Sequence, residues 1–219
     1  MSPTPRPSPT SPRRDRPAAR VPFVGLTGGM ASGKSTALAI LGDLGAATIS
    51  SDGVVHDLLG TDEVRDAVAK RLGPGVVADG RLDRAEMAAR VFGTDEDREW
   101  LEGLLWPRVR QRVGAWRDEL AVLEDPPRAA IVEVPLLFEA GMEAAYDHTI
   151  AIVAEEGVRS ERAGSRGHQE VDGRTGRQLT QEQKSQRADF TVRNDGTREE
   201  LQAELSRVLA TIGAGIGKE

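Results

Sequence analysis

The hydrophobic residues of this chain form two kinds of pattern, short continuous runs and longer stretches with helical spacing. The helical spacing predicts helices at 34–45 and 198–212. Strands are predicted by the continuous runs PFVGLT (22–27), AATIS (46–50), RAAIVEVPLLF (128–138), HTIAIVA (148–154) and ADFTVRND (188–195). Because these strands alternate with helices, we predict an α/β fold with a parallel sheet flanked by helices.

The stretch from residue 61 to residue 120 has helical spacing and no convincing strand-like run. Only GPGVVADGRLD (73–83) interrupts it, and its glycines and proline indicate a turn. We therefore expect a helical insertion beside the sheet. Its core is expected to contain Trp100, Trp106 and Trp116 with the neighbouring leucines.

Length and composition limit the classes of protein to which the chain can belong. Its 219 residues are enough for one domain, predicted at 21–219, and a content of 38% hydrophobic and 29% charged residues is typical of a soluble protein. Residues 1–20 are rich in proline, serine and arginine and predict a disordered tail. No run is long enough to span a bilayer and no signal peptide is evident, so we expect a cytoplasmic protein without membrane contact.

Charge and cysteine content exclude further classes. The net charge is −6, and because the tail holds five arginines and one aspartate, the rest of the chain carries −10. A chain with this much negative charge outside its tail is not expected to bind nucleic acid in general, because the phosphate backbone is negative as well. The absence of cysteine removes disulfides, thiolate nucleophiles and cysteine-based zinc sites. Nothing in the sequence indicates an obligatory protein partner.

A glycine-rich loop directly after the first predicted strand is the strongest chemical signal. The segment GLTGGMASGKST (25–36) contains G-x-x-x-x-G-K-[ST], whose backbone N–H groups surround a polyphosphate. Lys34 is expected over the β- and γ-phosphates, and Ser35 is expected to bind Mg²⁺. The predicted ATP-binding residues of the loop are Gly28, Gly29, Met30, Ala31, Ser32, Gly33, Lys34, Ser35 and Thr36.

Missing motifs narrow the choice among phosphate-loop proteins. The chain has no guanine-reading NKxD, and no predicted strand ends in a pair of acids. One acid, Glu133, lies near the end of the strand at 128–138. These features favour a small kinase over a switch or a motor. Another small-molecule kinase, or a nucleotide-dependent binding protein with no acceptor, remain as alternatives.

Phosphoryl transfer needs a carboxylate near the acceptor hydroxyl, and Asp52 is the best candidate. It follows the second predicted strand, and the carboxyl ends of parallel strands border the ligand crevice of such folds. An aspartate at a strand–helix junction can equally be a helix N-cap. The spacing leaves both roles open.

Arginines in the charged helical region 157–187 are candidates for a lid over ATP. Arg162 and Arg166 are four residues apart, so they share one helix face and could clamp phosphate oxygens. The interspersed acids Glu161, Glu170, Asp172 and Glu182 fit a solvated helix face equally well. Both interpretations stay open at this point.

Taken together, residues 22 to about 210 resemble the dephospho-CoA kinase family, which catalyses the last step of coenzyme A synthesis. The resemblance depends on the phosphate loop and on the segments ISSDGVVHDLL (49–59), DGRLDRAEMAARVF (79–92), LEGLLWPRV (101–109), VPLLFEAG (134–141) and RAGSRG…RTGRQLTQEQKSQRADFTVRNDG (162–196). It implies ATP-dependent phosphorylation of the ribose 3′-hydroxyl of dephospho-CoA. It also implies a P-loop kinase fold with a substrate-binding helical insertion and a helical lid.

The resemblance assigns roles to matching residues. Asp52 becomes the catalytic base, Arg162 the lid arginine that faces the phosphates with Arg166 beside it, and Asn194 a residue near the adenine. Glu133 would help position Mg²⁺ through water. Dephospho-CoA would be bordered by Asp52, Arg84, Leu137, Phe138 and Glu139. One departure is evident, because the family usually has His-Pro where this chain has Trp106-Pro107.

Overall fold

The computed structural model describes residues 20–91, 93–165 and 178–215. Of the predicted tail, only Arg20 belongs to these residues, and its guanidinium pairs with the Asp147 carboxylate at 3.0 Å. The other residues of the predicted tail, 1–19, lie outside the described residues. The predicted lid residue Arg166 lies outside the described residues.

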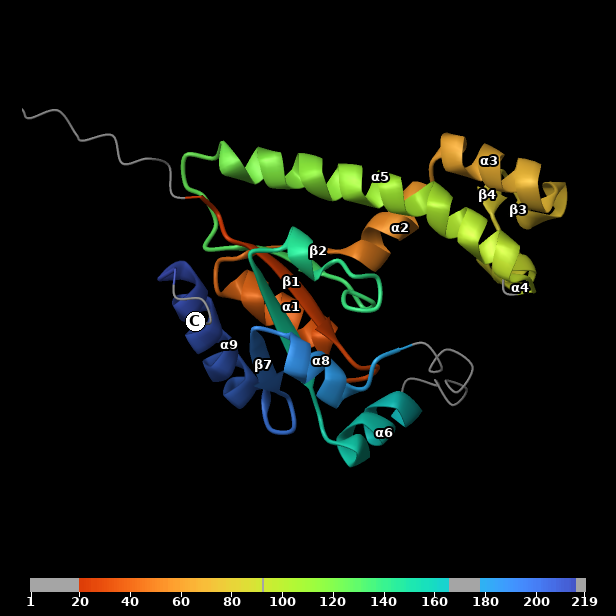
Figure 1. Cartoon of the computed structure of the whole chain (residues 1–219). Helices are drawn as coiled ribbons and strands as arrows, with labels where there is room; N and C mark the ends of the chain where they lie inside the picture. The colour runs from red at the N-terminus through yellow and green to blue at the C-terminus, as the bar shows by residue number, and fades with distance from the viewer. Residues whose placement is uncertain (1–19, 92, 166–177, 216–219) are drawn as a thin grey trace, which may run out of the picture.

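A five-stranded parallel sheet forms the centre of the molecule and confirms the predicted fold class (Figure 1). Its order is β2-β5-β1-β6-β7. The strands are β1 (Phe23–Gly28), β2 (Ala47–Ser50), β5 (Ala130–Glu133), β6 (His148–Val153) and β7 (Phe190–Arg193). All six residues of β1 are buried, as expected for the central strand of a sheet covered on both faces.

Helices cover both faces of this sheet. One face packs on α1 (Lys34–Asp43) and α9 (Arg198–Gly213), whose apolar residues share a core with β1, β5, β6 and β7. The other face packs on the second half of α5 (Asp95–Ala121) and on the end of α8 (Gln181–Arg187). The carboxyl edge of the sheet is followed by α2 (Ser51–Leu59) after β2 and by α6 (Glu156–Ser165) after β6.

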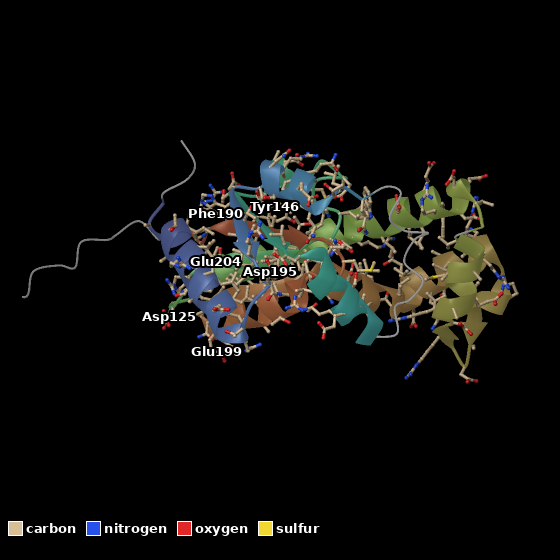
Figure 2. All side chains as sticks on the ribbon, turned by 90° about the horizontal axis from the view of Figure 1, so that it is seen from below. Asp125, Tyr146, Phe190, Asp195, Glu199 and Glu204 are labelled. Carbon is tan, nitrogen blue, oxygen red and sulfur yellow. The ribbon has the colours of Figure 1, made fainter. Side chains whose placement is uncertain are left out.

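The predicted helical insertion forms a separate group at one end of the molecule (Figure 1). It contains α3 (Asp62–Leu72), α4 (Arg84–Val91) and the first half of α5, which share a small core of their own. Figure 2 shows the same separation from below, with α9, which carries Glu199 and Glu204, at the opposite end.

The expectation that this insertion contains no strand was wrong. A short antiparallel hairpin joins β3 (Val77–Ala78) and β4 (Arg81–Leu82). Asp79 and Gly80, the two residues between them, have φ values of 50° and 74°. Positive φ at both positions is the geometry of the two-residue hairpin turn that Asp-Gly favours.

Two other predictions need correction. The strand expected over 128–138 ends at Glu133, just before Pro135, which has no N–H for the ladder. The three tryptophans do not form one core either. Trp100 packs in the insertion and Trp116 packs against the main sheet, whereas Trp106 is 42% exposed.

No helix in the described part of the chain combines the length and the apolar composition needed to cross a membrane.

Candidate active site

The phosphate loop connects β1 to α1, and its shape depends on glycine at two positions. Gly33 is the N-cap of α1 with a φ of 92°, and a Cβ placed there would lie 2.0 Å from Asn194 Nδ2. A Cβ on Gly28 would lie 2.3 Å from the carbonyl oxygen of Ile152. Any larger residue at either position would collide with its neighbours, so the loop lies close to β6 and to the end of β7.

Side chains from distant segments hold the other residues of the loop. Arg159 Nε donates to the Met30 carbonyl at 2.8 Å, and Asn194 Nδ2 donates to the Ser32 carbonyl at 2.8 Å. Between them, Ala31 has a φ of 56°, a conformation that non-glycine residues rarely adopt. These bonds occupy two loop carbonyls, so that the backbone between β1 and α1 is fixed.

Asn194, which the resemblance places near the adenine, is held against the phosphate loop. The residue is 6% exposed, and its side-chain amide is engaged by the phosphate loop. Its carbonyl also accepts a hydrogen bond from the Arg162 guanidinium at 3.0 Å. Asn194 therefore connects the loop to α6, and its amide is directed at the protein backbone.

Lys34 lies across the loop that it follows. Its ammonium donates to the carbonyls of Gly28 and Gly29 at 3.2 and 3.0 Å. Burial lowers the pKa of Lys34, while the nearby carboxylate of Glu133 acts in the opposite direction. The next residues, Ser35 and Thr36, lie in the first turn of α1, with Ser35 exposed.

Two carboxylates come together at the carboxyl edge of the sheet. Glu133 is the last residue of β5 and pairs in register with Ser50, the last residue of β2. Asp52 follows two residues later in the first turn of α2. Glu133 is only 8% exposed, whereas Asp52 is exposed to solvent. Burial raises the pKa of Glu133, and the nearby Lys34 opposes that shift.

The position of Asp52 bears on its two possible roles. Ser50 occupies the N-cap position of α2, so Asp52 is not the cap. Burial lowers the pKa of Lys34 and raises the pKa of Glu133, and the negative charge of Asp52 opposes the first shift and adds to the second, as expected for a carboxylate beside the phosphate loop. The geometry therefore favours a role at the phosphate site.

Arg162 of α6 also lies beside the phosphate loop. Its guanidinium is 3.8 Å from where a Cβ on Gly33 would be. Together with Lys34, it places a second positive charge at the N-terminus of α1, where the helix dipole already favours anions.

The predicted acceptor residue Arg84 contacts α2. Its guanidinium lies 2.5 Å from Nδ1 of His56, which is one helical turn beyond Asp52. His56 was not among the site residues predicted from the sequence. The four-residue spacing from Asp52 was the signal that both side chains share one face of α2.

The segment Leu137–Glu139 differs from the expectation. Leu137 and Phe138 have buried side chains in the core, so neither side chain can line an open substrate site. Glu139 is engaged by the buried Lys184 at 2.9 Å. In this turn the exposed apolar side chain is Leu136, which is 41% exposed.

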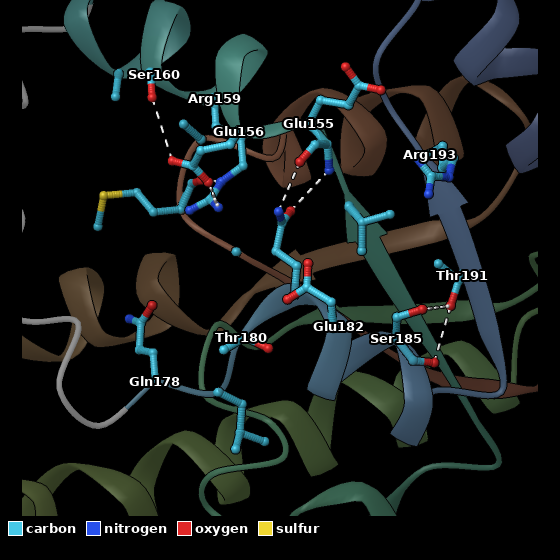
Figure 3. A pocket seen from close by; sticks show the side chains of 18 residues that line it. Glu155, Glu156, Arg159, Ser160, Gln178, Thr180, Glu182, Ser185, Thr191 and Arg193 are labelled. Atoms are coloured by element: carbon cyan, nitrogen blue, oxygen red, sulfur yellow. Dashed lines mark hydrogen bonds and ion pairs between the residues drawn. The ribbon is translucent and has the colours of Figure 1, made fainter.

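A cavity of about 910 Å³ adjoins the phosphate loop (Figure 3). Glu156, Arg159 and Ser160 of α6 line one side, and Glu182 of α8 with its N-cap Thr180 lines the other. The backbone of residues 29–31 forms part of the wall. Its volume suits a ligand of nucleotide size.

Comparisons with known proteins agree with this arrangement. Residues 22–200 match the family model described as dephospho-CoA kinase (CoaE). A dephospho-CoA kinase of Geobacillus kaustophilus is 33% identical over 192 residues, covering 85% of this chain and 94% of the relative. One from Anaeromyxobacter dehalogenans is 36% identical over 201 residues, covering 89% and 94%.

Solved structures show the same similarity. The crystal structure of TT1252 from Thermus thermophilus matches with a TM-score of 0.73 and 34% identity, covering 88% of this chain and 98% of that protein. The dephospho-CoA kinase from Campylobacter jejuni matches with a TM-score of 0.67 and 26% identity, with the same coverage. The similarity thus extends over nearly the full length of both structures.

Proposed function

The chain belongs to the dephospho-CoA kinase family, whose members use ATP to phosphorylate dephospho-CoA and give coenzyme A, and we propose that Asp52, Lys34 and Arg162 carry out this reaction. The observation that carries the proposal is the position of Asp52. It lies two residues beyond the end of β2, beside the phosphate loop and next to the strand that ends in Glu133. The acceptor is the ribose 3′-hydroxyl.

In this mechanism Asp52 accepts the proton of the acceptor hydroxyl. The hydroxyl oxygen forms the new bond to the γ-phosphorus, and the bond between the γ-phosphorus and its bridging oxygen breaks. ADP leaves with that electron pair. Lys34 and Arg162 stabilise the negative charge on the transferring group, because preorganised cations act strongly where water is excluded.

Mg²⁺ fits the chemistry of the side chains beside the loop. Ser35 offers a hydroxyl and Glu133 a buried carboxylate, the hard oxygen donors that this ion prefers. Among the described residues no group of three or more His, Cys, Asp or Glu could hold a metal. Phosphate and water oxygens would therefore supply the other ligands, with Glu133 acting through water. When bound, the ion neutralises phosphate charge.

Replacing Glu133 with glutamine is expected to weaken magnesium use. The Mg²⁺ concentration for half-maximal activity should rise about 10- to 100-fold, the usual effect of losing an outer-shell partner. The pKa of Glu133 is raised by burial, so this carboxylate takes up its proton at a higher pH than an ordinary glutamate. As the pH falls, the wild-type requirement for Mg²⁺ should therefore approach that of the variant.

The matched control for this experiment is Glu119→Gln, an exposed glutamate on α5. Initial rates are measured over a Mg²⁺ titration at several pH values. Equal magnesium requirements for wild type and Glu133→Gln at every pH would remove Glu133 from the metal site.

The acceptor assignment is tested by product analysis. Incubation with MgATP and dephospho-CoA is expected to give ADP and a product heavier by one phosphoryl group, located on the ribose 3′-oxygen. Nucleoside monophosphates and sugar acids, the acceptors of alternative small-molecule kinases, should stay unmodified. Phosphorylation of one of these acceptors in place of dephospho-CoA would contradict the proposal.

Arg84, His56 and Leu136 are the side chains we expect to contact dephospho-CoA. The insertion at 61–120 would bind this substrate, and the region 157–187 would cover ATP. A cytoplasmic location and independence from protein partners, nucleic acid and membranes remain predictions from the sequence.

A further inference from the structure

Lys184 is a lysine in the interior of the protein. It lies in the middle of α8, is fully buried, and is not needed for any step above. Its ammonium donates to the Pro135 carbonyl at 2.6 Å and pairs with Glu139 Oε1 at 2.9 Å. Glu139 Oε1 also accepts the backbone N–H of Leu179, just before α8. The buried charge is thus paired with a carboxylate that is itself held by the backbone.

The Pro135 carbonyl is the point where this network reaches the active site. It accepts a second hydrogen bond from the hydroxyl of Thr27 at 3.1 Å. Thr27 lies in β1 directly before Gly28, the first glycine of the phosphate loop, and Pro135 is two residues beyond Glu133. One carbonyl oxygen therefore joins the strand that leads into the phosphate loop to the strand that carries Glu133.

Helix α8 has further contacts that fix it against the loop. The side-chain amide of Gln181 donates to the Ala154 carbonyl at 2.8 Å and accepts its N–H at 2.9 Å. A Cβ on Gly29 would lie 2.9 Å from Gln181 Cγ, so the helix directly supports the loop. Burial lowers the pKa of Lys34, and the positive charge of Lys184 adds to that shift.

Stability alone does not explain a buried ion pair of this kind. Removing an ammonium from water is costly, and apolar residues of similar volume often stabilise a protein as well or better. In addition, Oε2 of Glu139 is buried without a hydrogen-bond partner in the described part of the chain. A well-packed Met–Leu pair would avoid both costs, which leaves geometry as the contribution of Lys184.

We propose that Lys184 is a positioning residue for phosphoryl transfer, which holds the turn after β5 against the end of β1 and so aligns Glu133 and the acceptor side with the phosphate loop. Lys184 does not contact the reacting atoms. Without its ammonium, the Pro135 carbonyl loses its hydrogen bond from α8, whereas the phosphate loop keeps its bonds to Arg159 and Asn194. The loop that binds ATP stays intact, but its alignment with the part of the site that holds dephospho-CoA is lost.

The test variant is Lys184→Met, with Arg207→Met on the exposed surface of α9 as the matched control. ADP and CoA are measured separately at saturating MgATP and dephospho-CoA. We expect kcat for CoA formation to fall about 10- to 100-fold, because a shift of about 1 Å has effects of this size. KM for ATP should stay within about 3-fold, and the ratio of ADP to CoA should rise, since water replaces the misplaced acceptor.

A change in melting temperature alone, with kcat within about 2-fold and an unchanged ADP-to-CoA ratio, would show that Lys184 is only structural. If Lys184→Met does not fold, the double variant Lys184→Met/Glu139→Leu removes both charges and is judged by the same ratio. The inference rests on the transfer site proposed above. The two proposals are contradicted by different results. Normal activity of Asp52→Asn would exclude Asp52 as the base, but it would not change the ADP-to-CoA ratio measured for Lys184→Met.

Discussion

Asp52→Asn is expected to lower kcat for CoA formation by about 10²- to 10⁴-fold, the usual contribution of a general base. The substitution keeps the size of the side chain and removes its ability to accept a proton. KM for ATP should change little, because the loop that binds the phosphates is held by Asn194 and Arg159. Steady-state CoA formation and ATP binding measure the two effects separately.

Asp57→Asn provides the control for this experiment. Asp57 is an exposed aspartate on the same helix, five residues beyond Asp52. The substitution removes the same charge outside the site, so kcat of the Asp57→Asn variant should equal that of wild type within about 2-fold. Near-normal turnover of Asp52→Asn would exclude Asp52 as the base and return it to a local role in α2.

Lys34→Met is expected to lower kcat by about 10²- to 10³-fold, as the loss of a single preorganised donor does in comparable sites. The methionine keeps most of the apolar stem but has no ammonium to place over the phosphates. Glu133 would then lose its neighbouring positive charge, so its pKa should rise further. The loss of activity should therefore be larger at lower pH than at higher pH.

Arg207→Met, which removes an exposed positive charge from α9, serves again as the control. Rates are compared at pH 6.5 and 8.5 for both variants, after thermal unfolding has shown that each is folded. If Lys34→Met kept a kcat within about 3-fold of wild type, the assignment of the phosphate site to this loop would be wrong. If the loss of kcat were the same at both pH values, the effect of Lys34 on activity would not depend on the protonation of Glu133.

Features formed by neighbouring residues could be predicted from the sequence, because the interactions that form them lie within one or two elements. The phosphate loop needs one strand, a run with glycines at particular positions and one helix, all within fourteen residues, Phe23 to Thr36. The alternation of helices with the five strands of the main sheet followed from the hydrophobic pattern. The turn at Asp79-Gly80 was equally local and was predicted, but the strands on its two sides have only two residues each and leave no recognisable run in the sequence.

Other features depend on residues that are distant in sequence and adjacent in space. Asn194 and Ser32 are separated by 162 positions, so the sequence could not show that the amide holds the loop. Lys184 reads as one of many basic residues in a charged region, yet it is fully buried. Its partners come from a turn about 50 residues earlier.

The sequence by itself therefore determined the α/β order, the phosphate loop and the acidic residue after the second strand, because each depends on neighbours within one or two elements. Only the tertiary structure decided which side chains remain available for chemistry. It buried Leu137 and Phe138, exposed Trp106, and brought Glu133, Asp52 and Lys34 together at one edge of the sheet. Burial and pairing across the sheet set the pKa values and positions that such a site requires, and neither is encoded by local pattern.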